Sequence, residues 1–319
     1  MPLKTPSFWY APLGIHAILL TPLSWVYRLG CFIDQNFKKD TSYKAKIPVI
    51  CIGNAVAGGS GKTPTAIALL KLLEAKNAHF LLRGYGGSIT QATLVDPNKH
   101  TAEQVGDEAI MLARYAPAII ASNRAEGAKL AEQNGADIIL MDDGLQNNSL
   151  HKDLSFLVVD GVSKFGNNKI IPAGPLREPI AKIMSRIDSV IYIGGPLHSD
   201  KPVFQASLAP SAKLDTSKKY VAFAGIGRPE KFKATLDALG ANIVGWHAFA
   251  DHHTYSAHEI QSLKNEASTQ NTVLITTEKD FVRLSSDMQK DIQTLPIEMA
   301  FKQESTLKKF LTTHLRKTS

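Results

Sequence analysis

The sequence predicts an α/β protein with a parallel sheet flanked by helices, followed by a second, smaller α/β domain. Short apolar runs typical of buried strands alternate along the chain with longer stretches of helical periodicity. This alternation favours parallel strands, because each needs a helical crossover to reach the next. The 319 residues, 44% hydrophobic and 20% charged, are too many for one small domain and too ordinary in composition for a disordered chain.

Positive charge lies mainly at the two ends of the chain. The sequence has 36 Lys and Arg against 29 Asp and Glu, a net charge of +7. Residues 1–60 hold six of the basic and two of the acidic residues, and residues 301–319 hold five and one. A nucleic-acid-binding surface needs Lys and Arg massed along the folded body, which is nearly neutral here. We therefore expect no nucleic-acid partner.

Residues 1–36 form an N-terminal segment of their own. Residues 5–27 carry no formal charge, and a stretch of that length is long enough to cross a bilayer. Three prolines interrupt it, and Trp and Tyr residues lie near both of its ends, as they do at membrane interfaces. We predict a helix over residues 11–21, resuming to about residue 36, that lies on a membrane face with the following basic residues near anionic head groups. The alternative is a helix that packs on the protein's own core.

A glycine-rich loop follows the first predicted strand. The β-branched run 47–52 predicts the strand, and the apolar-periodic stretch 64–73 predicts a helix after the loop. Backbone N–H groups of such a loop, together with the helix N-terminus, bind phosphate oxygens. Lys62 is placed to reach the β- and γ-phosphates, and the Thr63 hydroxyl to hold Mg²⁺. The residues predicted to bind ATP are Val56, Ala57, Gly58, Gly59, Ser60, Gly61, Lys62 and Thr63.

The loop departs from the usual spacing at one position. A strict P-loop has glycine five residues before Gly61, where this chain has Val56. The neighbouring Gly58 and Gly59 compensate, and Gly-Lys-Thr at a strand-to-helix turn remains a strong signal for a nucleotide site. We therefore predict a P-loop NTPase-type domain over residues 37–208.

Two aspartates end a second predicted strand. The apolar run 136–141 leads into Asp142 and Asp143, and a third strand is predicted at residues 154–160. A P-loop needs a carboxylate at the end of such a strand to complete the magnesium site that begins at Thr63. One or both aspartates are therefore predicted Mg²⁺ ligands, and a solvated acidic turn is the alternative.

The rest of the chain predicts a smaller C-terminal α/β domain over residues 209–319. Its predicted strands are 219–224, 242–246 and 272–276, and its predicted helices are 229–239 and 256–267. Two further strands, 203–208 and 297–301, flank this domain and predict a short two-stranded hinge.

Several short motifs, taken in chain order, resemble one enzyme family. They are Gly53-Asn54, Gly58 to Pro64, Arg83 to Gly87, Val105 to Glu108, Asp142 to Gln146, Pro172 to Glu178, Asp251 to His253 and Thr277 to Asp280. Together they cover about residues 10–285 and resemble the tetraacyldisaccharide 4'-kinase family of lipid A biosynthesis. Two departures are visible: Asn147 stands where the family usually has His, and Arg228 follows Gly227 at a variable position.

The resemblance implies an activity and a cellular location. It implies transfer of the γ-phosphoryl group of ATP, with Mg²⁺, to the 4'-hydroxyl of a membrane-embedded tetraacylated glucosamine disaccharide 1-phosphate, which forms lipid IVA. It also implies a peripheral or monotopic protein on the cytoplasmic face of the bacterial inner membrane, in contact with anionic lipid.

The resemblance further suggests a catalytic pair. Phosphoryl transfer to a hydroxyl needs charge neutralisation, which Lys62 and Mg²⁺ would supply, and an acceptor for the proton. Asp107 and His252 are suggested to act as a dyad, either of them finally holding the proton. A helix cap is the alternative for Asp107. A metal site, which the spacing does not favour, is the alternative for the group His247, His252, His253 and His258.

Five residues are candidates for substrate contacts. Arg124 and Arg177 can each bind a phosphate, of ATP or of the lipid, through a planar guanidinium, with salt bridges inside the protein as the alternative. Tyr85 and Gln146, in loops beside the glycine loop, are candidate sugar contacts. The resemblance adds Glu178, at the end of its motif.

Two other classes of function remain open. One is a P-loop GTPase or ATPase whose hydrolysis drives a partner protein or metal delivery. Thr277 to Asp280 superficially suggests a guanine-binding motif, but that motif places Lys and Asp two residues apart, and here they are adjacent. The other class is a membrane-bound scaffold with a vestigial nucleotide site, which the presence of Lys62, Thr63 and both aspartates disfavours.

Overall fold

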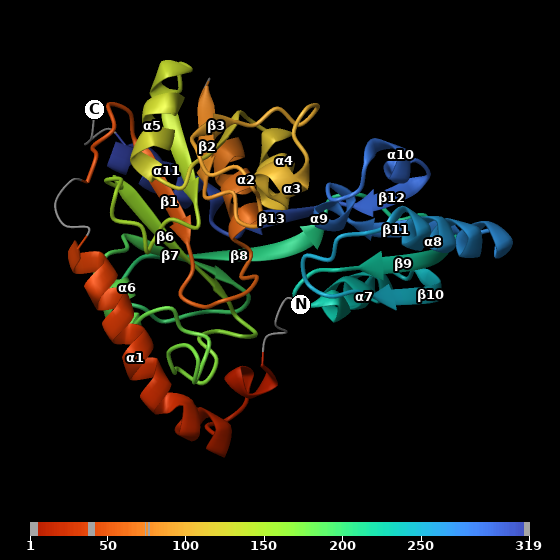
Figure 1. The fold of residues 1–319 in the computed structure, drawn as a ribbon, viewed down its shortest axis with the longest axis horizontal. Helices are drawn as coiled ribbons and strands as arrows, with labels where there is room; N and C mark the ends of the chain where they lie inside the picture. The colour runs from red at the N-terminus through yellow and green to blue at the C-terminus, as the bar shows by residue number, and fades with distance from the viewer. Residues whose placement is uncertain (1–5, 38–41, 74, 76, 316–319) are drawn as a thin grey trace.

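The computed structural model, which describes residues 6–37, 42–73, 75 and 77–315, has a larger and a smaller unit, each built on one β-sheet (Figure 1). The larger sheet has the strand order β13-β8-β7-β6-β1-β5-β2-β4-β3. Its strands pair in parallel except at the edges, where β3 and β13 are antiparallel to their neighbours, so the predicted parallel sheet is a mixed one. The strands are β1 (Val49–Gly53), β2 (Ala78–Leu82), β3 (Thr93–Leu94), β4 (Ala118–Ile120), β5 (Ile138–Asp142), β6 (Leu154–Asp160), β7 (Ser189–Ile193), β8 (Val203–Pro210) and β13 (Ile297–Phe301).

Alternating side chains of β1 divide the core between the two faces of this sheet. Ile50 and Ile52 pack with α2, α4 and α11 on one face, and Val49 and Cys51 pack with α5 and α6 on the other. Burial on both faces is expected for a parallel strand covered by helices on either side. The helices of this larger unit are α2 (Lys62–Leu73), α3 (Ala102–Val105), α4 (Asp107–Ala113), α5 (Arg124–Gln133), α6 (Ile180–Met184) and α11 (Glu304–Leu315).

The smaller unit is built on a sheet with the order β10-β9-β11-β12, in which all strands are parallel. Phe232 and Leu236 of α7 pack on one face of it, and Ile260 and Leu263 of α8 pack on the other. The predicted α/β class is therefore confirmed for both layers. The elements are β9 (Lys219–Ala224), α7 (Pro229–Ala238), β10 (Asn242–Ala248), α8 (Ala257–Thr269), β11 (Val273–Thr277), α9 (Glu278–Phe281), α10 (Ser286–Gln289) and β12 (Ile292–Leu295).

The chain passes between the two units twice, at neighbouring points. β8 and β13 are antiparallel, with Ile297 opposite Pro210, and the Ser211 N–H donates to the Pro296 carbonyl at 3.0 Å. After β13 the chain stays on the larger sheet, where α11 buries Leu307 and Leu311. β13 and α11, which we had grouped with residues 209–319, thus lie in the larger unit, and residues 219–295 form the smaller sheet and its helices.

The N-terminal segment forms η1 (Ser7–Tyr10) and one continuous helix, α1 (Ile15–Phe37), which lies along the larger unit (Figure 1). The interruption that we predicted near residue 21 is wrong, because the helix continues through Pro22. Ser24 docks the helix, since its hydroxyl donates to the Ile170 carbonyl at 2.7 Å and accepts from the Ala173 N–H at 3.3 Å.

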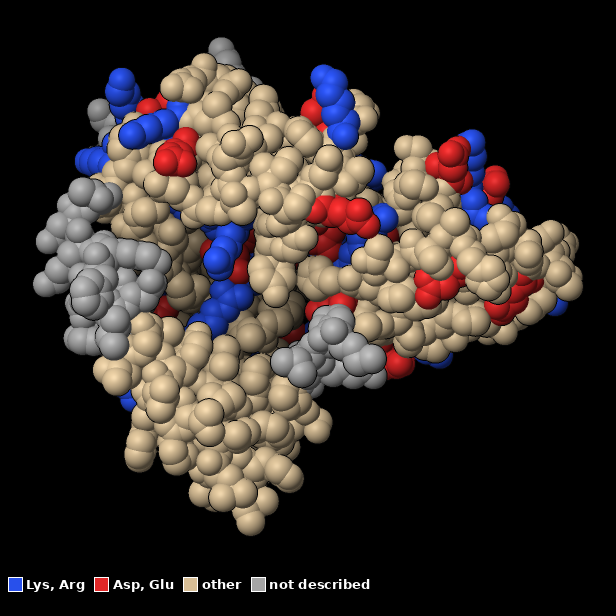
Figure 2. Space-filling model, viewed as in Figure 1, with Lys and Arg blue, Asp and Glu red and all other residues tan. Residues whose placement is uncertain are grey.

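The opposite side of α1 is apolar and faces away from the protein. Ile15, Leu19, Leu23, Val26 and other apolar side chains there are each more than half exposed. Figure 2 shows this region of the surface almost without charged residues. Within the described ranges, no helix is both long enough and apolar enough to span a bilayer. The basic residues Lys4, Lys38, Lys39, Arg316 and Lys317 of the two chain ends lie outside the described residues.

Candidate active site

The glycine loop leaves β1 at Gly53 and enters α2 at Lys62, as the sequence predicts. Gly61 has φ +86°, a backbone conformation that residues with a side chain rarely adopt, so the position favours glycine. Val56, where a strict P-loop has glycine, pairs with Leu176 in an isolated antiparallel bridge. The Ala57 N–H donates to the Pro175 carbonyl at 2.8 Å, which extends this pairing. Extended backbone accepts valine without strain, which explains the irregular spacing.

The two aspartates at the end of β5 face different partners. Asp142, only 2% exposed, accepts a hydrogen bond at 3.2 Å from the Thr63 hydroxyl through Oδ2, while its Oδ1 is buried without a hydrogen-bond partner in the described chain. Burial, and secondarily the charge of Glu108, raises the pKa of Asp142. The arrangement leaves one buried carboxylate oxygen beside the Thr63 hydroxyl, and divalent cations with oxygen ligands occupy such positions.

Asp143 points instead to basic side chains. Its Oδ1 lies 3.8 Å from Nζ of Lys62 and accepts a hydrogen bond from Arg177 at 2.8 Å. Burial alone would raise the pKa of Asp143, but the charges of Lys62 and Arg177 outweigh it and hold the pKa below its ordinary value. Its backbone φ of +55° turns the chain sharply after β5, so the two neighbouring carboxylates diverge.

Arg177, Gln146 and Glu178 form one polar cluster beside the loop. Arg177 donates to Oε1 of Gln146 at 3.3 Å, and Nε2 of Gln146 donates to Glu178 at 3.2 Å and to the Asn54 carbonyl at 3.3 Å. Arg186 also donates to Glu178. For Arg177 the salt bridge that we considered as an alternative is present, with Asp143 as its partner.

Arg124, at the start of α5, behaves differently from Arg177. Its side chain is 3% exposed, it donates to the Ala121 carbonyl, and its Nε has no hydrogen-bond partner in the described part of the chain. Burial, and secondarily the neighbouring charge of Arg83, lowers the pKa of Arg124 to about 10. A buried guanidinium with an unused N–H suits an anionic ligand.

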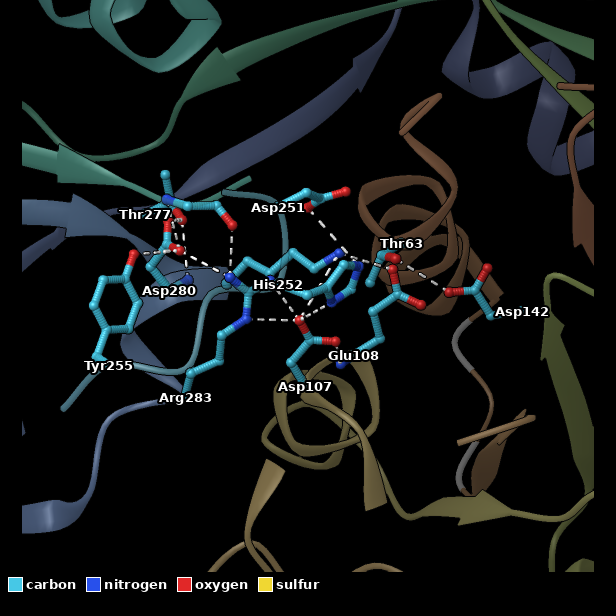
Figure 3. A network of polar contacts seen from close by, with 12 residues as sticks. Thr63, Asp107, Glu108, Asp142, Asp251, His252, Tyr255, Thr277, Asp280 and Arg283 are labelled. Atoms are coloured by element: carbon cyan, nitrogen blue, oxygen red, sulfur yellow. Dashed lines mark hydrogen bonds and ion pairs between the residues drawn. The ribbon is translucent and has the colours of Figure 1, made fainter. Parts of the chain in front are cut away.

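Asp107 and His252 are brought together from the two units (Figure 3). Asp107 is the first residue of α4 and is buried, with Oδ1 accepting from the Glu108 N–H at 2.8 Å; Gly106 occupies the N-cap position, so Asp107 is not the helix cap that we considered as an alternative. Its Oδ2 lies 3.1 Å from Nδ1 of His252. His252 follows β10 in a loop with φ +56°.

The Tyr85 side chain lies next to His252. A Cβ on Gly106 would come 2.6 Å from the Tyr85 carbonyl, so only glycine lets the Tyr85 loop approach the start of α4 this closely. The Tyr85 ring is 71% exposed, and its centre lies 6.0 Å from that of His252. Tyr85 therefore stays a candidate for a ligand contact, as the sequence suggested.

The other histidines do not join His252. His247 contacts Glu266 at 2.9 Å, and His253 contacts Glu259 at 3.1 Å. Among the described residues, no three or more His, Cys, Asp and Glu side chains are grouped to bind a metal ion. Each of these imidazoles has its own carboxylate.

Five side chains near Asp107 were not predicted as part of the site. Arg283 donates to Asp107, Lys279 lies 3.2 Å from Glu108, and Asp280 accepts a hydrogen bond from Tyr255 at 2.9 Å. Lys279 and Asp280 belong to the motif that we compared with a guanine-binding sequence. The sequence did offer one signal for a functional role of these two residues: the motif belongs to the pattern that resembles the family, and it follows a predicted strand.

Comparisons with known proteins agree on one family. Residues 16–316 match the family model described as Tetraacyldisaccharide-1-P 4'-kinase. Tetraacyldisaccharide 4'-kinase of Rhodospirillum centenum is 41% identical over 325 residues, covering 97% of this chain and 96% of that protein, and its counterpart in Rhodospirillum rubrum is 43% identical over 315 residues, covering 94% of each. The crystal structure of LpxK from Aquifex aeolicus in complex with ATP superimposes with a TM-score of 0.80 and 26% identity, covering 94% of this chain and 99% of that one.

Proposed function

This chain belongs to the tetraacyldisaccharide-1-P 4'-kinase family, and from that premise we propose how its own residues carry out the reaction. The reaction is the ATP-dependent phosphorylation of a tetraacyldisaccharide 1-phosphate at its 4'-hydroxyl, a step of lipid A biosynthesis. The partner-driving NTPase and the scaffold are set aside as functions. The roles of individual residues in the reaction are our proposals.

Residues 56–63 bind the phosphates of ATP in this proposal. The backbone N–H groups of residues 58–63 and the N-terminus of α2 would bind the phosphate oxygens, whereas the Ala57 N–H already donates to the Pro175 carbonyl. Lys62 neutralises charge on the transferred phosphoryl group. Asp143, whose Oδ1 lies 3.8 Å from Nζ of Lys62, holds the ammonium group in place.

Thr63 and Asp142 would hold Mg²⁺. The fit rests on the unpartnered Oδ1 of Asp142 and on the nearby Thr63 hydroxyl, both hard oxygen donors at the end of a buried strand. Bound there, the ion would neutralise phosphate charge during transfer. Asp143, the other predicted ligand, is directed to Lys62 and Arg177, so we assign it a supporting role.

His252 and Asp107 deal with the proton. The 4'-oxygen attacks the γ-phosphorus, the bond from that phosphorus to the β–γ bridging oxygen breaks, and ADP leaves. Asp107 accepts a hydrogen bond from Nδ1 of His252, which leaves Nε2 to take the hydroxyl proton. Because several cations hold Asp107 ionised, we propose that it orients the imidazole and stabilises the imidazolium.

The substrate would lie between the Tyr85 loop and the cluster of Arg177, Gln146 and Glu178. Tyr85 offers an exposed ring to a sugar, and the cluster offers polar groups to its hydroxyls. Arg124, with its buried unpaired N–H, is assigned to a phosphate. These contacts stay proposals, supported by burial and by unused donors.

The apolar face of α1 would lie in the membrane interface. Its exposed aliphatic and Trp side chains suit the acyl boundary, and Arg28 near them suits anionic lipid head groups. We propose a peripheral or monotopic protein on the cytoplasmic face of the inner membrane, where the acylated substrate resides.

The domain division also stays a proposal. We propose an N-terminal segment 1–36, a kinase domain beginning at residue 37, and a smaller domain that moves about the β8–β13 connection. A dyad with one member on each unit supports closure on substrate.

The observation that carries this assignment is the 3.1 Å contact between His252 and Asp107 beside the Thr63–Asp142 pair (Figure 3). The test supplies the purified protein with Mg-ATP and tetraacyldisaccharide 1-phosphate in detergent micelles. We expect a doubly phosphorylated lipid and ATP turnover that depends on the lipid. ATP hydrolysis indifferent to the lipid would contradict the proposal.

A further inference from the structure

Arg283 spans the contact between the two units. It follows α9 in the smaller unit, and its side chain is only 6% exposed. Nε and one terminal nitrogen, Nη2, donate to Oδ2 of Asp107 at 2.9 and 2.6 Å. The other terminal nitrogen, Nη1, donates to the Gly225 carbonyl at 2.7 Å and to Oδ1 of Asp280 at 2.9 Å. All three nitrogens are thus used, two of them toward Asp107 and the third toward the smaller unit itself.

We infer that Arg283 is a positioning residue, which fixes Asp107 so that its Oδ2 meets His252 only when the smaller unit lies against α4. The inference rests on the proposed roles of Asp107 and His252 and extends them. Asp107 comes from the larger unit, whereas His252 and Arg283 come from the smaller one. The carboxylate is therefore oriented by the same unit that brings the imidazole.

The Nη1 atom of Arg283, which does not contact Asp107, is held by the buried carboxylate of Asp280. Asp280 is fully buried, and its Oδ1 accepts from the Gly225 N–H at 3.0 Å and from the Tyr255 hydroxyl at 2.9 Å (Figure 3). Its Oδ2 accepts from the Thr277 hydroxyl at 2.6 Å. With every oxygen used, Asp280 cannot turn without losing bonds, and this holds the guanidinium in one orientation. The motif Thr277 to Asp280 thereby acquires a role.

Lys279 does not duplicate Arg283. Its Nζ lies 3.2 Å from Glu108 but 4.0 Å from Oδ2 of Asp107, so its main partner is the neighbouring carboxylate. Arg283 is the cation that makes two hydrogen bonds to Asp107. A lysine at position 283 has one ammonium and would keep the charge without the forked geometry.

The charges around Asp107 set the expected pH dependence. Glu108 lies on its own helix, Lys279, Asp280 and Arg283 face it from α9 and the following turn, and Asp251 and His252 face it from the loop after β10. Burial alone would raise the pKa of Asp107, but the hydrogen bond from His252 and the charges of Lys279 and Arg283 hold it well below its ordinary value. Removing the Arg283 charge should raise the pKa of Asp107, because the carboxylate loses a cationic neighbour.

The test compares Arg283→Met and Arg283→Lys with a matched control, Arg114→Met. Arg114 is an exposed arginine at the other end of α4 that lies over the Phe281 ring of α9, without contact with Asp107. We expect Arg283→Met to lower kcat by on the order of 100-fold, with KM for ATP within about twofold, and to move the acid limb of the kcat/KM profile to higher pH. Arg283→Lys should recover part of kcat, and Arg114→Met should leave all three quantities unchanged.

A second comparison, in an Asp107→Asn background, separates positioning from general stability. If Arg283 acts through Asp107, adding Arg283→Met to Asp107→Asn should cost less than about threefold more, whereas an independent structural role would add its full loss. Should Arg283→Met not fold, as judged by circular dichroism, Arg283→Lys and Asp280→Asn take its place in both comparisons.

The kinetics of these variants separate a failure of the proposed dyad from a failure of the inference about Arg283. An Asp107→Asn enzyme that keeps its kcat would overturn the proposed dyad itself. A slow Asp107→Asn enzyme together with an Arg283→Met enzyme that keeps its kcat and its pH profile would overturn only the inference about Arg283.

Discussion

The Nζ atom of Lys231 lies 2.6 Å from Oδ2 of Asp160, and this ion pair joins the smaller unit to the larger one. Arg228 lies 3.8 Å from the same oxygen and stacks over the Tyr10 ring, 4.8 Å from its centre. The Tyr10 hydroxyl donates to the Ala57 carbonyl of the glycine loop at 3.4 Å. The N-terminal segment, the nucleotide site and the smaller unit thus meet at one set of charges.

We expect reversing one charge of this pair to weaken closure of the two units. Lys231→Asp should lower kcat/KM about two- to fivefold, since two carboxylates would then face each other and exposed pairs contribute ~0.5–1 kcal/mol. Added salt should bring kcat/KM of Lys231→Asp closer to that of the wild type. The double variant Asp160→Lys, Lys231→Asp should recover activity. Lys233→Asp is the control, because Lys233 pairs with Asp237 inside α7. Equal losses for both single variants would disconnect the Asp160 pair from closure.

Removing the carboxylate beside Thr63 should separate metal binding from nucleotide binding. We expect Asp142→Asn to weaken binding of ATP in the presence of Mg²⁺ by about tenfold or more, and to leave metal-free ATP binding nearly unchanged. Calorimetric titration with and without Mg²⁺ measures both. Asp143→Asn, which frees Lys62 and Arg177, should instead weaken both kinds of binding. The proposal fails if Asp142→Asn has the same effect with and without the metal.

Substituting the dyad should slow chemistry and spare nucleotide binding. We expect Asp107→Asn and His252→Gln each to lower kcat by ~10²–10⁴-fold, the usual contribution of a positioned acid–base group. Neither side chain contacts residues 56–63 in the structure, so the affinity for ATP should change little. Single-turnover phosphorylation and equilibrium ATP binding provide the two readouts. Strong loss of ATP affinity in both variants would place them in the nucleotide site.

The lowered pKa of Asp107 also predicts how stability varies with pH. A carboxyl whose pKa is lower in the folded state stabilises the fold above its unfolded pKa, near 4, and loses this contribution as the pH falls through its folded pKa. We expect the free energy of unfolding of the wild type to exceed that of Asp107→Asn at pH 7, with the difference shrinking below about pH 4. Urea unfolding at several pH values measures it. The pKa of Asp142 is raised in the wild type and in Asp107→Asn alike, so its contribution cancels when their free energies of unfolding are subtracted. A difference that is constant from pH 7 to pH 3 would show that Asp107 contributes nothing through its charge.

The local parts of the site could be predicted from the sequence, because each depends on neighbouring residues. A β-branched run, a glycine run and a periodic helix fix the loop before Lys62, and an apolar strand brings Asp142 and Asp143 to the same edge. The unusual residue at Val56 is visible in the sequence, but its structural cause could not be predicted, because it is pairing with Leu176, far along the chain.

Apart from the pairing of Asp107 with His252, which the family resemblance suggested, contacts between the two units could not be predicted. Arg283 reaches Asp107 across 176 positions in sequence, and a lone arginine after a short helix carries no signal of its own. The continuity of α1 through Pro22 was missed for a related reason. Proline disfavours a helix locally, but the docking of Ser24 against the loop at Ile170 and Ala173 acts on the whole helix.

The exposed face of α1 should anchor the protein to membranes. We expect Leu19→Glu combined with Leu23→Glu to release the protein from vesicles containing anionic phospholipid, because both side chains are more than half exposed and a buried carboxylate in the interface is costly. Folding should be unaffected, since neither side chain packs on the core. Val244→Glu, an exposed apolar position in β10 of the smaller unit, is the matched control and should bind vesicles like the wild type. Sedimentation with sucrose-loaded vesicles measures the bound fraction, and kcat/KM on micellar lipid reports the consequence. Retention of the double variant on vesicles, equal to that of the control, would show that α1 serves only to pack on the larger unit.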